Sequence, residues 1–450
     1  MKMLRNNLLT LTAAVSIVLP LSAWAGNGMN PEGTGVKNRG MGGSGVALAN
    51  EAASVITNPA ATVNVGDRWD VAFGIFDPSP RGYTLSGQPD LVAPIPGEQN
   101  FSGSQTSADD KFLIPFFGMV SPIDNNSAWS FVMSANGGMN TEYATNFAAK
   151  MAPVPGFTGN VSGPTGINLE QLFLNGTYSH KVTETVSLGY TAIYAHQAFE
   201  AKGLGAFKNA SRTPTALTDN GEDTSTGFGF KLGVQVNLGD GLKLGAAYQP
   251  KIEMSKFDKY KGLFPDQGQM DIAPTYTVGL GWVVSPQLTI AFDYHYIDYE
   301  AVSAISNSTN KYKNTSNGTA PCAQSAGSSC FGDPNGPGFG WKSISVYKLG
   351  GEYTLNPTMK LRAGWNHGEN PITPEEVTVA FLAPGVTEDH LTLGFTMAMD
   401  KTSEINFNYV KSFENSVSGK FAPKSPEFGG GNMTVSMEQQ FFEVGYAQYF

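Results

Sequence analysis

From Trp69 onward, apolar residues alternate with small or polar residues at a spacing of two. In the stretch 228–238, phenylalanine, leucine and valine take every even position, while glycine, lysine, glutamine and asparagine take the odd ones. Alternate side chains of a β-strand point to opposite faces, so each such stretch has one apolar face and one mixed face. The sequence holds fourteen of these segments, centred near residues 73, 116, 132, 174, 190, 233, 248, 278, 293, 349, 363, 395, 409 and 443.

The connections between these segments alternate between short and long. Gly239-Asp240-Gly241 and Asn356-Pro357 are examples of the short ones, whereas 145–167 and 305–340 are long. Outer-membrane barrels have short periplasmic turns and long external loops, and an even strand count puts both ends of the sheet in the periplasm. A soluble sandwich has no reason to sort its loops in this way. We therefore predict an all-β fold: a 14-stranded antiparallel transmembrane β-barrel over residues 67–450.

The last segment ends the chain on an aromatic residue. Phe450, Tyr446, Val444 and Phe442 fall on one face of it. A strand with this face is typical of the closing strand of a membrane barrel. We predict that it pairs with the first strand near Trp69.

The N-terminus resembles a secretory signal peptide. Lys2 and Arg5 precede an apolar run over 8–21, and Ala23-Trp24-Ala25 offers a small-x-small cleavage pattern. The run is too short to span a membrane. We expect residues 1–25 to be cleaved and the protein to reach the outer membrane of a Gram-negative cell.

Residues 26–66 lie between this leader and the first strand and are rich in glycine and alanine. Fourteen strands enclose a lumen wider than their own side chains fill. The stretch 46–63 is too apolar to remain solvated, which disfavours a disordered extension. We predict that 26–66 folds into the lumen as a hatch.

Composition excludes several other classes. Without Lys2 and Arg5 the chain carries 26 basic and 38 acidic residues, a net charge of −12 that argues against a nucleic-acid partner. None of the five histidines stands in a recognisable nucleophile motif, so we assign no catalytic residue, no metal site and no cofactor. Cys322 and Cys330 are predicted to form a local disulfide, as expected of an exported protein.

Three motifs are similar to one known family. The run 39–47, the triplet Asn58-Pro59-Ala60 and the strand 134–143 resemble the hatch and third strand of the FadL/TodX outer-membrane transporters of hydrophobic compounds. The resemblance implies a hatched 14-stranded barrel that takes up long-chain fatty acids or other apolar molecules by diffusion. It also implies release sideways into the membrane through an inward kink of the third strand.

The predicted exit is at Gly137 and Gly138, because a glycine pair in mid-strand favours a bulge or kink. Close approach of the hatch backbone would also require small residues there, and the two interpretations are compatible. For capture, the long loops offer exposed apolar candidates, or these residues pack together to close the barrel mouth. The candidates we name are Phe147, Met151, Phe157, Leu263 and Phe264.

A fatty-acid carboxylate favours a cation. The turn at Asn356-Pro357 places Glu352 opposite Arg362, which predicts a structural ion pair there. Lys202, beyond the outer end of the fifth strand, is our candidate for the ligand carboxylate.

The sequence thus predicts a monomeric, non-enzymatic uptake protein whose partners are an apolar ligand and outer-membrane lipid. Alternatives are a channel for aromatic or alkane hydrocarbons within the same family and a porin for polar solutes. The substrate itself is left open at this stage.

Overall fold

The computed structural model describes residues 26–86, 103–108, 111–146, 163–313, 315, 321–325, 327–420 and 431–450. The predicted signal peptide, 1–25, lies outside the described residues. No helix within the described ranges is long and apolar enough to cross a membrane.

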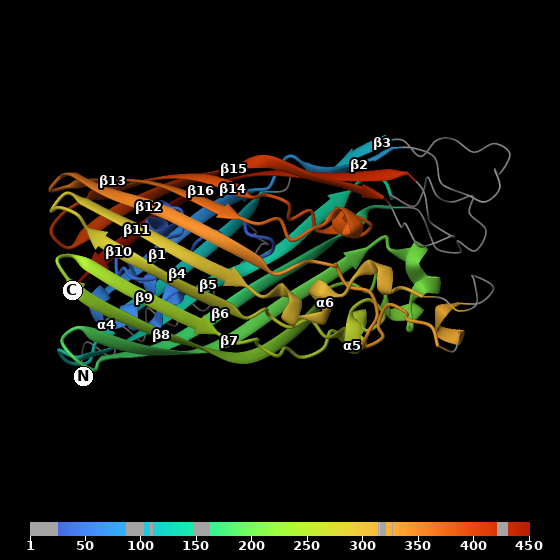
Figure 1. Cartoon of the computed structure of the whole chain (residues 1–450), viewed down its shortest axis with the longest axis horizontal. Helices are drawn as coiled ribbons and strands as arrows, with labels where there is room; N and C mark the ends of the chain where they lie inside the picture. The colour runs from blue at the N-terminus through green and yellow to red at the C-terminus, as the bar shows by residue number, and fades with distance from the viewer. Residues whose placement is uncertain are drawn as a thin grey trace.

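The described strands form one antiparallel sheet that closes on itself, and fourteen of them make the barrel wall (Figure 1). The wall strands are β1 (Arg68–Asp77), β4 (Phe112–Pro122), β5 (Ser127–Tyr143), β6 (Thr165–Lys181), β7 (Val186–Lys202), β8 (Asp223–Gly239), β9 (Leu242–Gln249), β10 (Thr275–Val283), β11 (Leu288–Ile297), β12 (Ile344–Asn356), β13 (Met359–Gly368), β14 (Asp389–Ala398), β15 (Ser403–Lys420) and β16 (Asn432–Tyr449). They coincide with the fourteen predicted segments, and the predicted barrel is confirmed.

The barrel closes between its first and last strands. Trp69 of β1 is opposite Gln448 of β16, as predicted from the closing strand. The outer part of β16 continues beyond β1 and pairs with β2 (Arg81–Ser86), which in turn pairs with β3 (Gly103–Thr106). Both strands lie between the first two predicted segments, in a connection for which no strand is predicted. Pro78 and Pro80, which lack an N–H donor, separate β1 from β2.

The two faces of the wall differ as the alternation predicts. Large apolar side chains such as Phe228, Val278 and Leu393 are exposed on the outer face. Polar side chains point inward, and Arg362 donates from Nε to Glu352 Oε2 over 2.7 Å across β12 and β13. The predicted cross-strand ion pair is therefore present.

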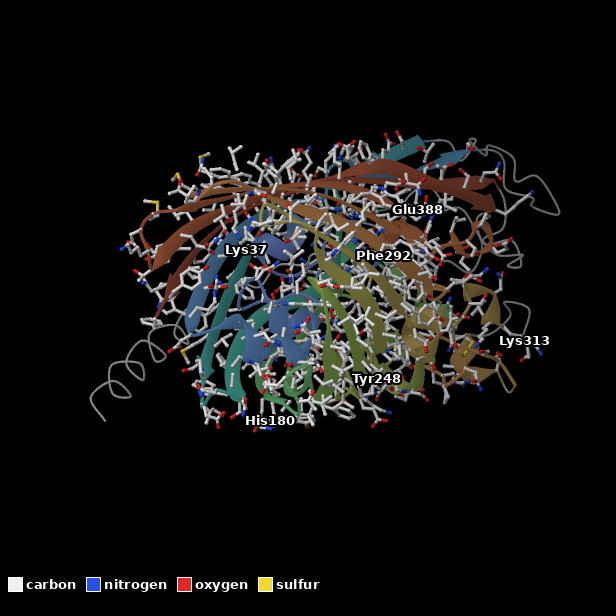
Figure 2. The ribbon with its side chains drawn as sticks, turned by 60° about the vertical axis from the view of Figure 1, so that its left-hand side comes forward. Lys37, His180, Tyr248, Phe292, Lys313 and Glu388 are labelled. Carbon is white, nitrogen blue, oxygen red and sulfur yellow. A yellow bond between two sulfur atoms is a disulfide. The ribbon has the colours of Figure 1, made fainter. Side chains whose placement is uncertain are left out.

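Residues 26–66 lie inside the barrel at the end where the turns are short (Figures 1 and 2). Their helices pack on the inner faces of β6–β8 and of β14–β16, and Figure 2 shows Lys37 enclosed by the wall. The helical elements are α2 (Val36–Arg39), α3 (Ser54–Thr57), η1 (Pro59–Ala61) and α4 (Thr62–Val65). We call this segment the hatch.

The long connections gather at the other end of the barrel, where they fold over the lumen (Figure 1). They carry a large cluster of buried apolar residues. Their helical turns are η3 (Gly205–Ala210), η4 (Pro214–Ala216), η5 (Asp258–Tyr260), α5 (Pro265–Gly268), η6 (Tyr299–Ala301), α6 (Ser303–Ser306), η7 (Thr309–Lys311), η8 (Cys322–Gln324), η9 (Pro374–Glu376) and η10 (Ala380–Leu382).

Candidate functional site

Asn58 ties the hatch to the wall. Its Nδ2 donates to the carbonyl of Val46 in the hatch (2.7 Å) and to that of Val234 in β8 (2.9 Å). Its Oδ1 accepts from the N–H of Ala60 (3.0 Å) and so caps η1, while Pro59 occupies the first position of that turn, where no donor is needed. The triplet Asn58-Pro59-Ala60 therefore ends one hatch segment and fastens it to a wall strand.

Buried carboxylates hold the hatch elsewhere. Asp293 of β11 accepts from the backbone N–H groups of Gly45 (2.8 Å) and Val46 (3.0 Å). Arg39 pairs with Glu443 of β16 and, at 3.1 Å from Nε, with Glu32 of the hatch. Burial raises the pKa of Glu32 to about 7, although the charge of Arg39 opposes this shift. A buried charge is costly unless paired, so these contacts fix the hatch in one position.

Glycines in the wall allow the hatch backbone to come close. A Cβ at Gly233 would lie 2.0 Å from Asn58 Oδ1, and one at Gly189 would lie 2.2 Å from the carbonyl carbon of Pro59. On the opposite side, a Cβ at Gly364 would lie 2.1 Å from the backbone nitrogen of Gly42. Any larger residue at these positions would displace the hatch.

The wall is interrupted between β4 and β5. Their pairing ends at Phe116 and Ser134, whereas β5 continues to Tyr143 and pairs there with β6. Toward its tip, β5 is held again, because Arg81 Nε donates to the carbonyl of Asn140 (3.0 Å) and the N–H of Ala108 donates to the carbonyl of Glu142 (2.7 Å). Between these points we call the interruption the side opening.

Gly137 and Gly138 lie at the edge of the side opening that faces the hatch. The register of β5 on β6 shifts between Ala135 and Gly137, and Gly137 has a φ of 141°, which favours glycine. The N–H of Gly138 turns away from the ladder and donates to the carbonyl of Met29 in the hatch (3.2 Å). The strand is thus bulged at the predicted glycine pair, and the hatch backbone approaches the same place.

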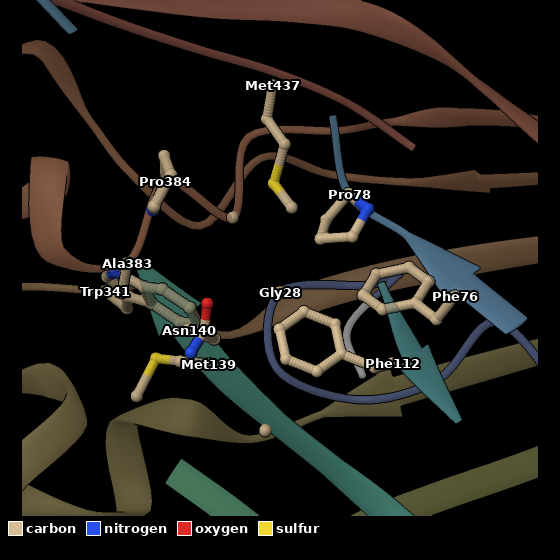
Figure 3. A pocket seen from close by; sticks show the side chains of 12 residues that line it. Gly28, Phe76, Pro78, Phe112, Met139, Asn140, Trp341, Ala383, Pro384 and Met437 are labelled. Carbon is tan, nitrogen blue, oxygen red and sulfur yellow. The ribbon is translucent and has the colours of Figure 1, made fainter. Parts of the chain in front are cut away.

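A partly open cavity lies against the side opening, with about 350 Å³ of empty space when the solvent at its mouth is included (Figure 3). We call it the wall cavity. The kinked strand, the ends of β1 and β4, the start of the hatch and two external connections line it. Its lining residues are Gly28, Phe76, Pro78, Phe112, Gly138, Met139, Asn140, Trp341, Ala383, Pro384, Gly385 and Met437.

A second, partly open cavity lies beneath the long loops, with about 510 Å³ of empty space when the solvent at its mouth is included. We call it the loop cavity. Its described lining carries no charged side chain, and its aromatic rings pack edge to face, with Phe199 and Phe264 4.7 Å apart between ring centres. The lining residues are Ile167, Phe199, Leu204, Phe207, Leu217, Leu263, Phe264, Ala304, Phe331, Pro337, Gly338, Phe339, Val379 and Leu382. Such a surface suits an apolar molecule.

Leu263 and Phe264, named from the sequence, both line the loop cavity. Phe147, Met151 and Phe157 lie outside the described residues. Lys202 is half-exposed, pairs with Glu200 at 3.1 Å and does not line either cavity, so its role toward a carboxylate stays a prediction.

The two cysteines are joined, with 2.06 Å between the sulfurs of Cys322 and Cys330. This link closes the loop that carries Phe331 into the loop cavity. The same loop is held from the side by Arg212, whose guanidinium pairs with Asp333 at 2.8 Å.

Sequence reasoning missed most of the loop-cavity lining. The run 377–383, Val-Thr-Val-Ala-Phe-Leu-Ala, was one available signal, since it is apolar within a long connection and yields Val379 and Leu382. Leu217 lies between Ala216 and Thr218, and Phe339 lies between two glycines, so neither belongs to an apolar run that would give such a signal.

A family model described as outer membrane protein transport protein (OMPP1/FadL/TodX) matches residues 17–440. The chain belongs to this family. The chain is similar to the long-chain fatty acid transport protein of Escherichia coli O6:H1, with 26% identity over 268 residues, or 56% of each chain. Outer membrane protein P1 of Haemophilus influenzae is 25% identical over 244 residues, covering 47% of this chain and 50% of that protein. The chain thus aligns with about half the length of these curated relatives.

Solved structures of the FadL/TodX family share the fold. The toluene transporter TodX of Pseudomonas putida matches with a TM-score of 0.63 and 16% identity, covering 93% of this chain and 99% of that one. A Pseudomonas aeruginosa FadL homologue gives the same TM-score and identity over 94% and 100%. At this identity the likeness establishes the architecture, and the ligand has to be argued from the cavities.

Proposed function

We propose that this protein takes up long-chain fatty acids or similar apolar molecules across the outer membrane by passive diffusion. The observation that carries the proposal is the pair of apolar cavities, one beneath the external loops and one against an interruption of the wall. A polar-solute porin would instead need an open, charged lumen, and the hatch fills it. No cofactor is required, because diffusion down a gradient needs none.

In this proposal a ligand first enters the loop cavity. Each methylene moved out of water contributes about 0.8 kcal/mol, so an apolar chain gains affinity without any specific polar contact. It then passes to the wall cavity and leaves through the side opening, between β4 and the outer half of β5, into the lipid. The lipid is the natural sink for a molecule of this kind.

The direct test is a substitution that narrows the side opening. Gly138 lines the wall cavity, so Gly138→Leu fills part of the route beside the side opening. We expect cells that produce this variant to lose most uptake of labelled oleate, while the purified protein still binds oleate in its loop cavity. Gly176→Leu is the matched control, since a Cβ there meets nothing within 4 Å.

Two results would refute the proposal. One is uptake of oleate and of hydrocarbons that does not differ between cells with and without the protein. The other is a steady conductance of nanosiemens size in planar bilayers, which would favour the porin.

We propose Lys202 as the partner of a ligand carboxylate. Its exposed pair with Glu200 is worth no more than about 1 kcal/mol, so a ligand can compete for the lysine. Lys202→Gln is expected to weaken binding of oleate about twofold to fivefold and to leave a neutral alkane unaffected. Equal effects on both ligands would remove Lys202 from the site.

We further propose that the mature protein begins at Gly26 after cleavage of residues 1–25 and acts as a monomer in the outer membrane. Mass spectrometry of the protein from purified outer membranes tests the first point. Its mass in detergent, after correction for bound detergent, tests the second.

A further inference from the structure

Two short segments separate the loop cavity from the wall cavity. Leu382 lines the loop cavity and the next residue, Ala383, lines the wall cavity. In the neighbouring connection, Phe339 lines the loop cavity and Trp341 the wall cavity. Figure 3 shows Trp341 and Ala383 side by side at one end of the wall cavity. We call these two segments, 339–341 and 380–383, the partition.

The partition is fastened to the kinked strand. In the outer half of β5, Thr141 Oγ1 donates to the carbonyl of Leu382 (2.8 Å) and Tyr143 Oη donates to the carbonyl of Phe381 (2.7 Å). All four residues are buried. Met139 lies on the same face of β5 and lines the wall cavity, so one strand face both borders the exit and holds the partition.

An aromatic cluster surrounds these hydrogen bonds. The ring of Tyr143 packs 6.1 Å from Phe381, and Tyr83 of β2 packs 5.0 Å from Tyr143 and 5.4 Å from Phe381. Tyr83 therefore contributes its ring to the same contact, but no hydrogen bond to the partition is found for its hydroxyl within the described residues. The two tyrosines differ in the one interaction of interest.

We propose that Thr141 and Tyr143 are positioning residues that hold the partition closed and couple it to the side opening. This inference rests on the proposed function, since it concerns passage between the two cavities. A ligand that displaces Leu382 pulls on the two hydrogen bonds to β5, and the outer half of β5 lacks β4 as a partner between Ser134 and the strand tip. Opening of the partition and widening of the side opening are then one event.

Hydrogen exchange followed by mass spectrometry tests the coupling without any substrate. Tyr143→Phe removes the hydroxyl that donates to the buried carbonyl of Phe381. We expect amides within 380–386 to exchange about tenfold faster, as for the loss of one buried hydrogen bond. Tyr83→Phe is the matched control and should exchange at the wild-type rate. Equal exchange in the two variants would overturn the proposal.

Uptake provides the second readout. Thr141→Val keeps the shape of the side chain and removes its donor, whereas Thr165→Val, opposite Tyr143 on β6, alters a buried hydroxyl for which no hydrogen bond is found among the described residues. The double variant Thr141→Val/Tyr143→Phe should take up labelled oleate several-fold faster than the wild type, with unchanged binding in the loop cavity. Faster exchange without faster uptake would show that the partition is not the barrier.

The two proposals fail in different ways. A wild-type protein that takes up no ligand refutes the proposed function, and the exchange comparison then still decides whether β5 holds the partition. A wild-type protein that transports oleate, with variants that match their controls, refutes only the role of Thr141 and Tyr143.

Discussion

The hatch end of the lumen and the loop end are closed by different kinds of contact. At the hatch end, Asn58, Asp293 and Arg39 make directional hydrogen bonds and ion pairs, and wall glycines let backbone meet backbone. At the loop end the closure is made largely of apolar side chains around two cavities. Directional polar contacts select one arrangement of the groups they join. Apolar contacts are non-directional, so an apolar ligand can replace them. We call the hatch, residues 26–66, the floor of the lumen, and the long connections around the loop cavity its roof. The difference in contacts indicates that the floor is fixed and that a ligand can displace the roof.

The largest effect should follow from forcing the hatch away from the wall. Gly364→Val places side-chain atoms where the backbone of Gly42 lies, and backbone has no room to give. We expect the hatch to be displaced and the barrel to conduct ions in planar bilayers. Gly176→Val, which meets open space, should remain closed. A closed Gly364→Val barrel would mean that the floor is as adaptable as the roof.

A smaller effect is expected from removing one polar anchor. Asn58→Ala removes one donor from each of the carbonyls of Val46 and Val234 and uncaps η1, which should weaken hatch docking by about 1–3 kcal/mol. The rate at which a protease cleaves the hatch measures this weakening of its docking. Asn64→Ala removes longer, partly buried contacts of 3.2 and 3.3 Å in the same segment and should matter less. Similar cleavage of both variants would count against the special role of Asn58.

At the roof, truncation should alter ligand affinity and leave the floor intact. Phe264→Ala removes a ring that lines the loop cavity, and binding of oleate should weaken about tenfold through lost apolar contact. Phe257→Ala tests specificity, since Phe257 packs 5.9 Å from Phe264 in the same cluster but does not line the cavity. Affinity lost equally in both would indicate a general collapse of the roof.

The smallest effect concerns pH. Burial raises the pKa of Glu32 and of Glu51 in the hatch to about 7, from 4.5 in a solvated chain. The docked hatch therefore binds these protons more tightly than an undocked one. Docking should be strongest below about pH 4.5 and should weaken as the pH rises from there through about 7. Burial lowers the pKa of Lys37 from 10.5 to about 8, so its contribution to docking changes with pH only above about pH 8.

Hydrogen exchange of the segment 32–52, corrected for the intrinsic rate, measures this dependence. Protection should be greater at about pH 5.5 than at about pH 7.5, and the double variant Glu32→Gln/Glu51→Gln should lose the difference. A wild-type hatch whose protection is the same at both values would contradict the argument. Loop-cavity binding of a neutral alkane should not change over this range.

The sequence predicts the wall of this molecule well, because period-two alternation is a local signal. It placed all fourteen strands, the pairing of Trp69 near the chain end and the opposition of Glu352 and Arg362. The bulge of β5 at Gly137 has a local cause too, since few residues other than glycine adopt its φ.

The cavities could be predicted only in part. Leu263 and Phe264 were found because they stand together in a loop, but Leu204, Phe331 and Leu382 meet only through packing of distant connections. The ion pair of Lys202 with Glu200 could have been predicted from the sequence. Glu200 is two residues away on the same strand, so both side chains point to one face and a local ion pair was the simpler expectation.

β16 runs along β1 and then, past Pro78 and Pro80, along β2. β16 is therefore continuous across the closure of the barrel, whereas the strand beside it is interrupted between β1 and β2, next to the side opening. The wall can therefore bend next to the side opening while the hydrogen-bonded pairing of β1 with β16 stays intact.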